Sequence, residues 1–476
     1  MPNKKLKKSI PIFLVFILIF NYVQAEPQSE NVISVSKNSL DALWVLIAAA
    51  LVFLMQAGFK SLEVGLVRKN HGSTVAMKNV IDWSVGSLIF FLVGFGIMFG
   101  ESHLGIIGTT FFLPSQFSFE GANSLGAIFF MFQLAFIGTA LTIVSGAMSE
   151  RTGFIPYFVA TIFIAILIYP VFGHWAWGSS FLQENIGWLE SIGFIDFAGS
   201  TVVHSLGAWV SLAGLVLLGA RIGRFDENGN PQDMKPHNIA YAVLGLFILW
   251  FGWWGFNGGS TLSFSEKVGV IILNTNIAGA TAGMAAYFHS YYFQNKKSIY
   301  EKLIGGALAG LVAITASAHI QSPLTSILIG LIAGVVHNLG FEFLLRKKID
   351  DAVGAIPIHG FGGVIGTLLV VIAPDIVAGG FINIAKQLAI QALGALVCFI
   401  WAFSMGYIIF KSLKRITGLR VSPKEEREGI LLYPQVQKVE EDIDEAELAS
   451  LLESMEAQTI QDDVKEADFT NNKTTN

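Results

Sequence analysis

The chain has 476 residues, of which 53% are hydrophobic and only 14% carry a charge, and its mean hydropathy is +0.60. This composition is typical of an integral protein of a lipid bilayer and excludes a soluble domain, and we expect neither an enzyme nor a nucleic-acid partner. The formal net charge of -5 predicts no partner for the apolar part, because much of the negative charge lies between Lys424 and Asp468.

The N-terminus has the pattern of a secretory signal peptide. Four lysines within the first eight residues precede an apolar stretch from Ile10 to Phe20, and small or apolar residues end at Ala25. Because this stretch is short for a full membrane span, we predict a signal peptide over 1–25 and a short extracytoplasmic segment over 26–38. An uncleaved anchor helix is the alternative.

Hydrophobic stretches long enough to cross a bilayer alternate with short polar turns from Leu40 onward. The sequence therefore predicts an all-α membrane protein with a membrane domain over 39–415 and a cytoplasmic acidic tail over 416–476. The eleven predicted transmembrane helices span residues 40–66, 79–100, 124–148, 153–175, 199–220, 238–258, 268–293, 303–320, 323–345, 354–373 and 385–411.

Every second connecting turn is basic, as at Arg68, Arg221 and Arg346, whereas the opposite turns carry acids such as Glu101 and Glu266. Because basic residues accumulate in cytoplasmic loops, this pattern predicts an external N-terminus and a cytoplasmic C-terminus. We expect a multi-pass protein of the cell inner (cytoplasmic) membrane.

Two histidines lie in apolar segments, each eight residues after an aspartate and three before a glycine. The two patterns are Asp196 with His204 and Asp351 with His359, and they fall on the fifth and tenth predicted spans. Ionisable groups are costly in such segments and often mark a pathway. Equivalent helices five spans apart cross in opposite directions, so we predict an inverted five-plus-five repeat, an unpaired eleventh helix and a site near the midplane.

Further segments resemble the ammonium transporter family, in its Amt branch of Amt/Mep/Rh, and they occur in family order between about residues 40 and 430. The resemblance implies an eleven-helix fold, a homotrimer with one pore per subunit, and ammonium uptake. The segments are Met55–Phe59, Glu63–Arg68, Met77–Asn79, Leu92–Gly96, Gly146–Arg151, Asp196–His204, Gly252–Ser260, Asn274–Asn276 and Asp350–Gly360.

The resemblance implies an outer ammonium-binding site at Phe132, Phe136, Trp177 and Ser260. Aromatic faces and a hydroxyl acceptor suit this ion, because ammonium donates directed hydrogen bonds while its charge interacts with the rings. The residues alone favour an interfacial tryptophan at Trp177 and a helix-end hydroxyl at Ser260 over a binding site.

A phenylalanine gate at Phe136 and Phe256 is also implied, with Trp253 as a support of the pore wall. Phe132 and Phe136 are four residues apart and therefore share one helix face. Apolar rings exclude hydrated ions, because nothing offsets the loss of their water. Packing or lipid contact is the alternative for both gate residues, since the chain has 39 phenylalanines.

His204 and His359 correspond in the resemblance to a twin-histidine pore. Two neutral imidazoles joined by a hydrogen bond offer edges that accept from or donate to a passing nitrogen. We therefore expect ammonium to lose its proton near the mouth and ammonia to pass the histidines. If the proton is also transferred, it follows a separate relay. The alternative is a structural pair. Asp196 is expected to cap a helix start, with a direct role as proton acceptor left open.

Other functions and partners stay open. An ammonium sensor that binds without sustained transport is one alternative, although the tail is too short for a fused kinase, and an Rh-like gas channel is another. The resemblance implies a PII-type signal protein as a possible cytoplasmic partner.

An amphipathic helix is expected over 439–455. We expect no cofactor and no metal, because Cys398 is the sole cysteine and no cluster resembles a metal site.

Overall fold

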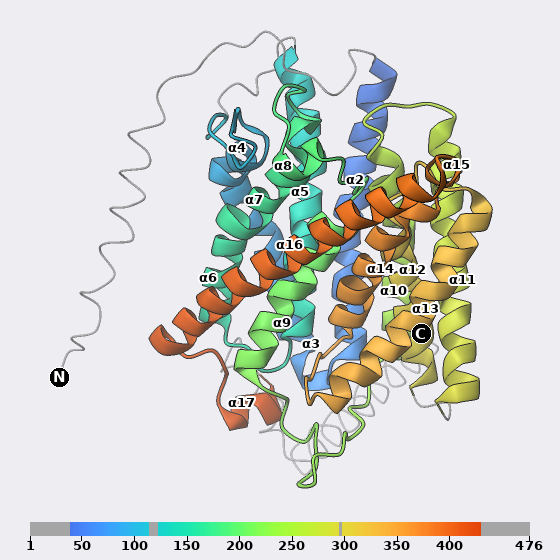
Figure 1. Ribbon diagram of the computed structural model, residues 1–476. Helices are drawn as coiled ribbons and strands as arrows, with labels where there is room; N and C mark the ends of the chain where they lie inside the picture. The colour runs from blue at the N-terminus through green and yellow to red at the C-terminus, as the bar shows by residue number, and fades with distance from the viewer. Residues whose placement is uncertain (1–38, 114–121, 295–297, 430–476) are drawn as a thin grey trace, which may run out of the picture. The chain divides into compact units, whose positions relative to one another are not determined.

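A computed structural model describes residues 39–113, 122–294 and 298–429 (Figure 1). The predicted signal peptide, the segment 26–38 and the tail helix expected over 439–455 lie outside the described residues. In the part that is described, the regular structure is helical apart from a short antiparallel pair, β1 (Ser102–His103) and β2 (Ile107–Gly108), with Ser102 opposite Gly108. The prediction of an all-α membrane architecture is confirmed at this level.

Nine helical stretches of the described residues are long and apolar enough to cross a membrane, which accords with a multi-pass protein. Several are built from consecutive elements that include a π-helical turn. The stretches comprise α2 (Ser39–Leu66); η2 (Lys69–His71), α3 (Gly72–Ile89), η3 (Phe90–Gly94) and α4 (Phe95–Phe99); α5 (Ala122–Ala147); α6 (Phe154–Phe163), η4 (Ile164–Ile168), α7 (Tyr169–Trp177) and η5 (Gly178–Ser180); η6 (Ser200–Ser205) and α9 (Leu206–Leu218); α10 (Ile239–Gly259); α11 (Lys267–Phe293); α13 (Pro323–Arg346); and α16 (Gly380–Ile416).

Two predicted spans are shorter in the structure. One is Ile356–Ile372, formed by η7 (Ile356–Phe361), α14 (Gly362–Leu368) and η8 (Leu369–Ile372). The other is α12 (Ile299–Ile314), which ends before the predicted boundary at 320. Its end has a structural reason, because the carbonyl oxygens of Thr315 and Ala316 accept hydrogen bonds from the chain that leads into η6. The count of eleven crossings stays a prediction.

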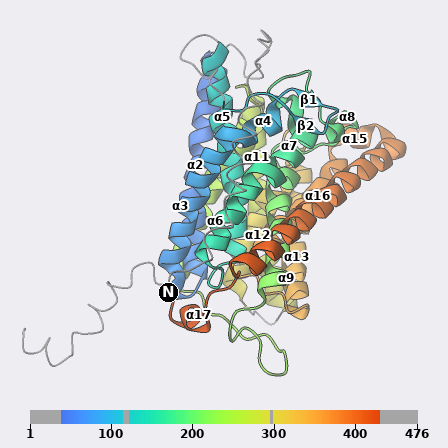
Figure 2. The same cartoon turned by 90° about the vertical axis from the view of Figure 1, so that its left-hand side faces the viewer.

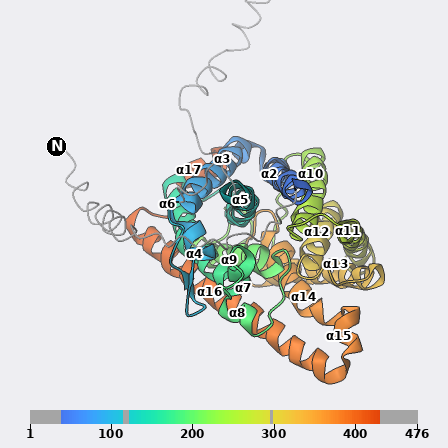
Figure 3. The same cartoon turned by 90° about the horizontal axis from the view of Figure 1, so that it is seen from above.

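Two helices occupy central positions. Seen from above, α5 is surrounded by α2, α3, α4 and α9, and α12 lies among α10, α11, α13 and α14 (Figure 3). Close backbone contact joins α2 to α10, because a Cβ atom on Gly65 would lie 2.4 Å from the Ala242 nitrogen and one on Gly245 would lie 2.3 Å from the Leu62 nitrogen. Small residues thus let these membrane helices approach closely.

The long helix α16 runs obliquely across the others (Figures 1 and 2). It extends over 37 residues, beginning five residues before and ending five residues after the predicted span of 385–411. It contacts α9, α14, α6 and η6, so it crosses elements that are far apart in the sequence. The remaining short helices are α8 (Trp188–Ser191), α15 (Pro374–Ala378) and α17 (Pro423–Glu428).

A buried cluster of ion pairs joins the loops at one end of the helices. Asp350 accepts hydrogen bonds from the Arg221 backbone N–H (2.9 Å) and from its guanidinium Nε (2.8 Å) and Nη2 (2.9 Å). Arg221 Nη1 also donates to Glu150 (2.8 Å), which pairs with Arg68. Burial alone would raise the pKa of the Asp350 carboxyl, but the Arg221 guanidinium outweighs burial and lowers that pKa below its usual range.

Removing the Asp350 carboxylate should destabilise the fold. We expect Asp350→Ala to lower the free energy of unfolding by about 3–5 kcal/mol, because the buried Arg221 charge loses one of its two carboxylate partners. The measurement is unfolding of the purified protein in detergent at neutral pH, where a carboxyl of lowered pKa is ionised and contributes fully. Asp375→Ala, in exposed α15, is the control; equal losses in both variants would contradict the expectation.

Candidate functional site

An aspartate holds the start of η6. Asp196 Oδ2 accepts hydrogen bonds from the backbone N–H groups of Thr201 (2.9 Å) and Val202 (2.8 Å). The chain turns at Gly199, whose φ of +104° favours glycine, and a Cβ atom there would lie 2.9 Å from the Trp177 ring. These contacts fix the position at which η6 begins and provide hydrogen-bond acceptors for its first backbone N–H groups. A helix that starts away from water needs such acceptors.

The same device recurs at η7. Asp351 Oδ2 accepts a hydrogen bond from the Ile356 backbone N–H at 2.6 Å, and its Oδ1 is buried without a partner among the described residues. Both π-helical turns place a histidine near their C-terminal end, His204 in η6 and His359 in η7. The equal spacing seen in the sequence therefore corresponds to two equivalent helix starts.

The two histidines are in contact. His204 Nδ1 lies 3.2 Å from His359 Nδ1, and the ring centroids are 5.2 Å apart at an interplanar angle of 18°. Both side chains are buried. One Nδ1 must therefore carry a proton and the other a lone pair, which fixes complementary tautomers for a neutral pair. His204 Nε2 has no hydrogen-bond partner among the described residues.

Aromatic rings continue the line from the histidines. Phe256 stacks near His204 with a centroid distance of 5.3 Å and against Phe136 at 4.1 Å and 22°. Trp253 packs on His204 at 5.2 Å, and its Nε1 donates to Thr315 Oγ1 at 2.9 Å, which holds the indole in place. The pair of phenylalanines and the support residue named from the sequence thus lie together beside the histidines.

The far end of this line is formed by Trp177, Phe132 and Ser260. Trp177 meets Phe136 edge to face at 6.1 Å, and Phe132 lies 4.7 Å from Phe136. The Trp177 Nε1 donates to the Asp196 carbonyl oxygen at 2.6 Å. Ser260 is half-buried at the end of α10, where its hydroxyl donates to the Phe256 carbonyl oxygen at 2.9 Å and keeps its lone pairs as acceptors.

Asp196 belongs to the same end and has one free acceptor atom. Its Oδ1 is buried without a partner among the described residues. Burial raises the pKa of the Asp196 carboxyl to about 6, although the N–H groups of Val202 and Thr201 act in the opposite direction. The group is therefore a helix cap whose second oxygen still has the capacity to accept a proton.

Gln391 on α16 is a structural part of the site that the sequence reasoning missed. Its buried amide donates from Nε2 to the carbonyl oxygens of Ile195 (2.6 Å) and Thr367 (3.1 Å) and accepts from the Ile195 N–H at 2.9 Å. Thr367 Oγ1 in turn lies 2.6 Å from Thr201 Oγ1. The amide thus joins the residue before Asp196 to α14. The signal in the sequence is an amide within an apolar stretch.

The column of aromatic rings and paired histidines inside a bundle of apolar helices defines a polytopic membrane protein with a polar site enclosed by hydrophobic residues. Comparison with known proteins then identifies the family. The model of the Ammonium Transporter Family matches residues 43–434, and the chain belongs to this family.

Similar proteins share most of their length with this chain. It is 41% identical to ammonium transporter Amt2 of Archaeoglobus fulgidus over 433 residues, which cover 88% of this chain and 92% of the relative. Ammonium transporter Amt2 of Methanocaldococcus jannaschii is 35% identical, with coverages of 83% and 89%.

Solved structures agree with this assignment. A structure titled "Sensor Amt Protein" aligns with a TM-score of 0.80 at 44% identity, covering 83% of this chain and 98% of that one. The crystal structure of Saccharomyces cerevisiae Mep2 aligns with a TM-score of 0.70 at 27% identity, covering 81% and 88%. The recognition of the family from sequence motifs is therefore confirmed.

Substituting Gln391 should loosen this end of the site. Gln391→Leu leaves the buried N–H and carbonyl of Ile195 without their partners, so we expect the free energy of unfolding to fall by about 2–4 kcal/mol. Thermal unfolding in detergent measures the loss. Lys386→Leu, at an exposed position of the same helix, is the control and should cost less than about 1 kcal/mol. Equal losses would show that Gln391 is not specially required.

Proposed function

We propose that the protein is an ammonium transporter that conducts ammonium or ammonia across the membrane. The observation that carries the proposal is the unbroken line of contacts from Trp177 through Phe136 and Phe256 to His204 and His359. Family membership and the names of the relatives support the same substrate. Relatives named as transporters also argue against an enzyme.

Recruitment of the cation takes place at the end formed by Trp177, Phe132, Phe136 and Ser260. The aromatic faces attract the positive charge, and the Ser260 lone pairs accept an N–H hydrogen bond, which K⁺ and Na⁺ have no means to donate. Ammonium therefore gains an interaction that the alkali cations lack. Asp196 holds Trp177 through its backbone and offers the nearby carboxylate oxygen.

The stacked rings of Phe136 and Phe256 act as a gate that excludes hydrated ions. A charged ion loses its hydration there without compensation, whereas neutral ammonia loses far less. In this scheme ammonium gives up its proton at the mouth, and ammonia passes His204 and His359 as neutral imidazoles. Net electrogenic uptake requires a separate proton relay, for which the hydrogen-bonded imidazole pair is the polar element at this level.

The membrane arrangement completes the proposal. The shorter α12 and the stretch 356–372 supplement the nine long stretches to give eleven crossings, arranged as an inverted repeat with α16 unpaired. The signal peptide over 1–25 places the mature N-terminus outside, and the basic loops place the C-terminus in the cytoplasm. We propose insertion in the inner membrane as a homotrimer, with a PII-type signal protein as a partner of the cytoplasmic face.

A sensor that binds ammonium without sustained transport is the second candidate. It is favoured by the likeness to the structure titled "Sensor Amt Protein", at 44% identity. Both candidates need the outer recruitment site, so binding alone does not separate them. A sustained current after ammonium addition does.

Current measurement on a solid-supported membrane tests transport directly. Addition of ammonium to the wild-type protein should give a sustained current, and His204→Ala combined with His359→Ala should abolish it or open a leak for other ions, because the polar contact at 3.2 Å is removed. Growth at low ammonium of a bacterium that lacks its own uptake system gives a second readout. Binding without current would favour the sensor, and a double variant with wild-type current and selectivity would rule out a role for the pair.

Selectivity tests the outer site. Trp177→Leu removes a ring face that ammonium, unlike K⁺, meets with an N–H group in a contact of about 0.5–1 kcal/mol, so the preference for ammonium over K⁺ should fall by roughly 2- to 5-fold. Competition of K⁺ with ammonium-driven current measures the ratio. Trp188→Leu, at a tryptophan of α8 in the outer loop, is the control. Unchanged selectivity in Trp177→Leu would contradict the assignment.

A further inference from the structure

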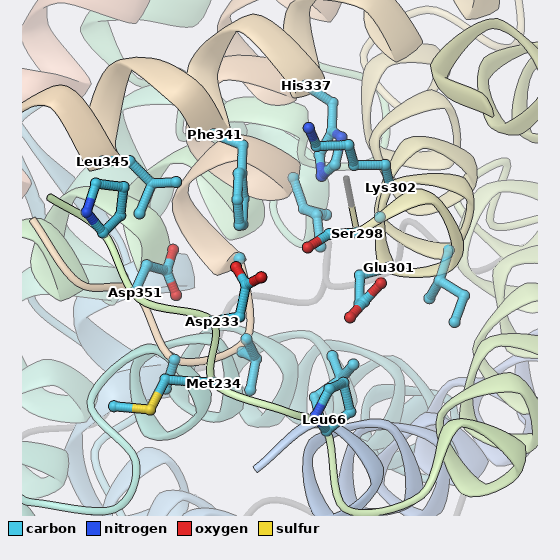
Figure 4. Close-up of a pocket in the computed structure, with 18 of the residues that line it drawn as sticks. Leu66, Asp233, Met234, Ser298, Glu301, Lys302, His337, Phe341, Leu345 and Asp351 are labelled. Atoms are coloured by element: carbon cyan, nitrogen blue, oxygen red, sulfur yellow. The ribbon is translucent and has the colours of Figure 1, made fainter. Parts of the chain in front are cut away.

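A cavity lies at the end of the helices opposite the aromatic mouth. Its volume is about 330 Å³, which is within the range of small-ligand sites. It reaches Ile358, the neighbour of His359, and is lined by parts of α2, α12 and α13 and by the loop after α9. Figure 4 shows side chains of His337, Phe341, Lys302, Glu301 and Asp351 around it.

His337 presents an oriented nitrogen to this cavity. Asn338 Nδ2 donates to the Ala286 carbonyl oxygen at 2.8 Å, so the orientation of the amide is set and its Oδ1 is an acceptor. His337 Nδ1 lies 3.1 Å from that Oδ1 and therefore carries the proton. The other nitrogen, Nε2, is left as an acceptor. In functional histidines, too, a hydrogen bond at one ring nitrogen fixes the tautomer and leaves the other nitrogen for the ligand.

No donor of the described residues occupies His337 Nε2, although the side chain is only 2% exposed. The residue that adjoins this atom is Gly305, where a Cβ atom would lie 2.4 Å from Nε2. Glycine thus keeps the space beside the acceptor free of a side chain. A nine-tenths buried, unpartnered acceptor that lines a cavity fits a ligand with a hydrogen-bond donor.

The charges around the cavity favour a cation. The Lys302 ammonium is bound to Glu342 (3.0 Å) and Gln294 (2.6 Å), and Arg221 is bound to Asp350 and Glu150. Arg224, which also lines the cavity, pairs with Asp350 at 3.4 Å, so these three positive charges are compensated, and Lys235 shares the lining with the acids Asp233 and Glu301. Asp351, by contrast, lines the cavity with a buried Oδ1 that has no partner among the described residues.

We propose that this cavity is an inner ammonium-binding site, in which His337 Nε2 accepts a hydrogen bond from the ion and Asp351 contributes negative charge. The inference rests on the proposed transport function and extends it to the second end of the pathway. The ligand is a small cation with N–H donors, one of which bonds to His337 Nε2. Alkali cations lack the donor that a neutral imidazole nitrogen requires here.

The test compares the two faces of the membrane. Inverted and right-side-out vesicles from cells that express the full chain present the cavity and the aromatic mouth, respectively, to added ammonium. We expect His337→Leu to raise the half-saturating ammonium concentration by about 3- to 10-fold at the cavity face, because one buried hydrogen bond is lost, and to leave the value at the aromatic face unchanged.

Two further variants separate binding from folding. His337→Gln keeps an acceptor and should restore most of the affinity at the cavity face, whereas Gly305→Ala should reproduce His337→Leu by filling the space beside Nε2. His103→Leu, an exposed histidine in β1, is the control and should change neither face. Equal changes at both faces, or no change in His337→Leu and Gly305→Ala, would overturn the inner site. Absence of transport by the wild type at both faces would instead refute the proposed function.

Discussion

The need to satisfy backbone amides away from water is the constraint on which the rest of the site depends. The starts of η6 and η7 lie inside the helix bundle, and their first N–H groups bond to the carboxylates of Asp196 and Asp351. Each anchored start carries a histidine a few residues later, and the two imidazoles meet at 3.2 Å. Without these caps, the first backbone amides would be buried without hydrogen-bond partners, and a helix start at this position would be unfavourable.

The end of this arrangement that carries Asp196 is held by α16. One buried amide, that of Gln391, bonds to both backbone groups of Ile195 and to the carbonyl of Thr367, and the Thr367 hydroxyl meets that of Thr201. The two helices that carry the histidines are therefore linked, at the end where Trp177 lies, by a helix that lies outside the proposed repeat. A hydrogen bond of this kind is directional, so it restricts the position of Asp196 more strongly than apolar packing does.

Features set by local sequence were predictable, and features set by distant contacts were not. The long apolar stretches and the two aspartate–histidine spacings depend on neighbouring residues, and the structure shows both. The early end of α12 depends on hydrogen bonds from Phe197 and Ala198, more than a hundred residues away, which no local pattern reveals. Asp350 and Glu150 lie in family-like segments to which the sequence assigns no partner, yet both are buried and form ion pairs with Arg221. Gln391 was overlooked for the same reason, and His337 was expected to be satisfied by neighbouring helices with no ligand role, since partners and free atoms appear only after folding.

The contacts around the stacked phenylalanines suggest which ring of the proposed gate is the more mobile. Phe256 packs against His204 and Trp253, and each of these neighbours is fixed by a hydrogen bond, to His359 and Thr315 respectively. Phe136 has Phe132 and Trp177 as neighbours, and of these two only Trp177 is fixed by a hydrogen bond, to the Asp196 carbonyl oxygen. Rotation of Phe256 would disturb two anchored groups, whereas rotation of Phe136 would disturb one, Trp177. The physical cost therefore favours opening through Phe136, with the histidine pair left undisturbed beneath a stationary Phe256.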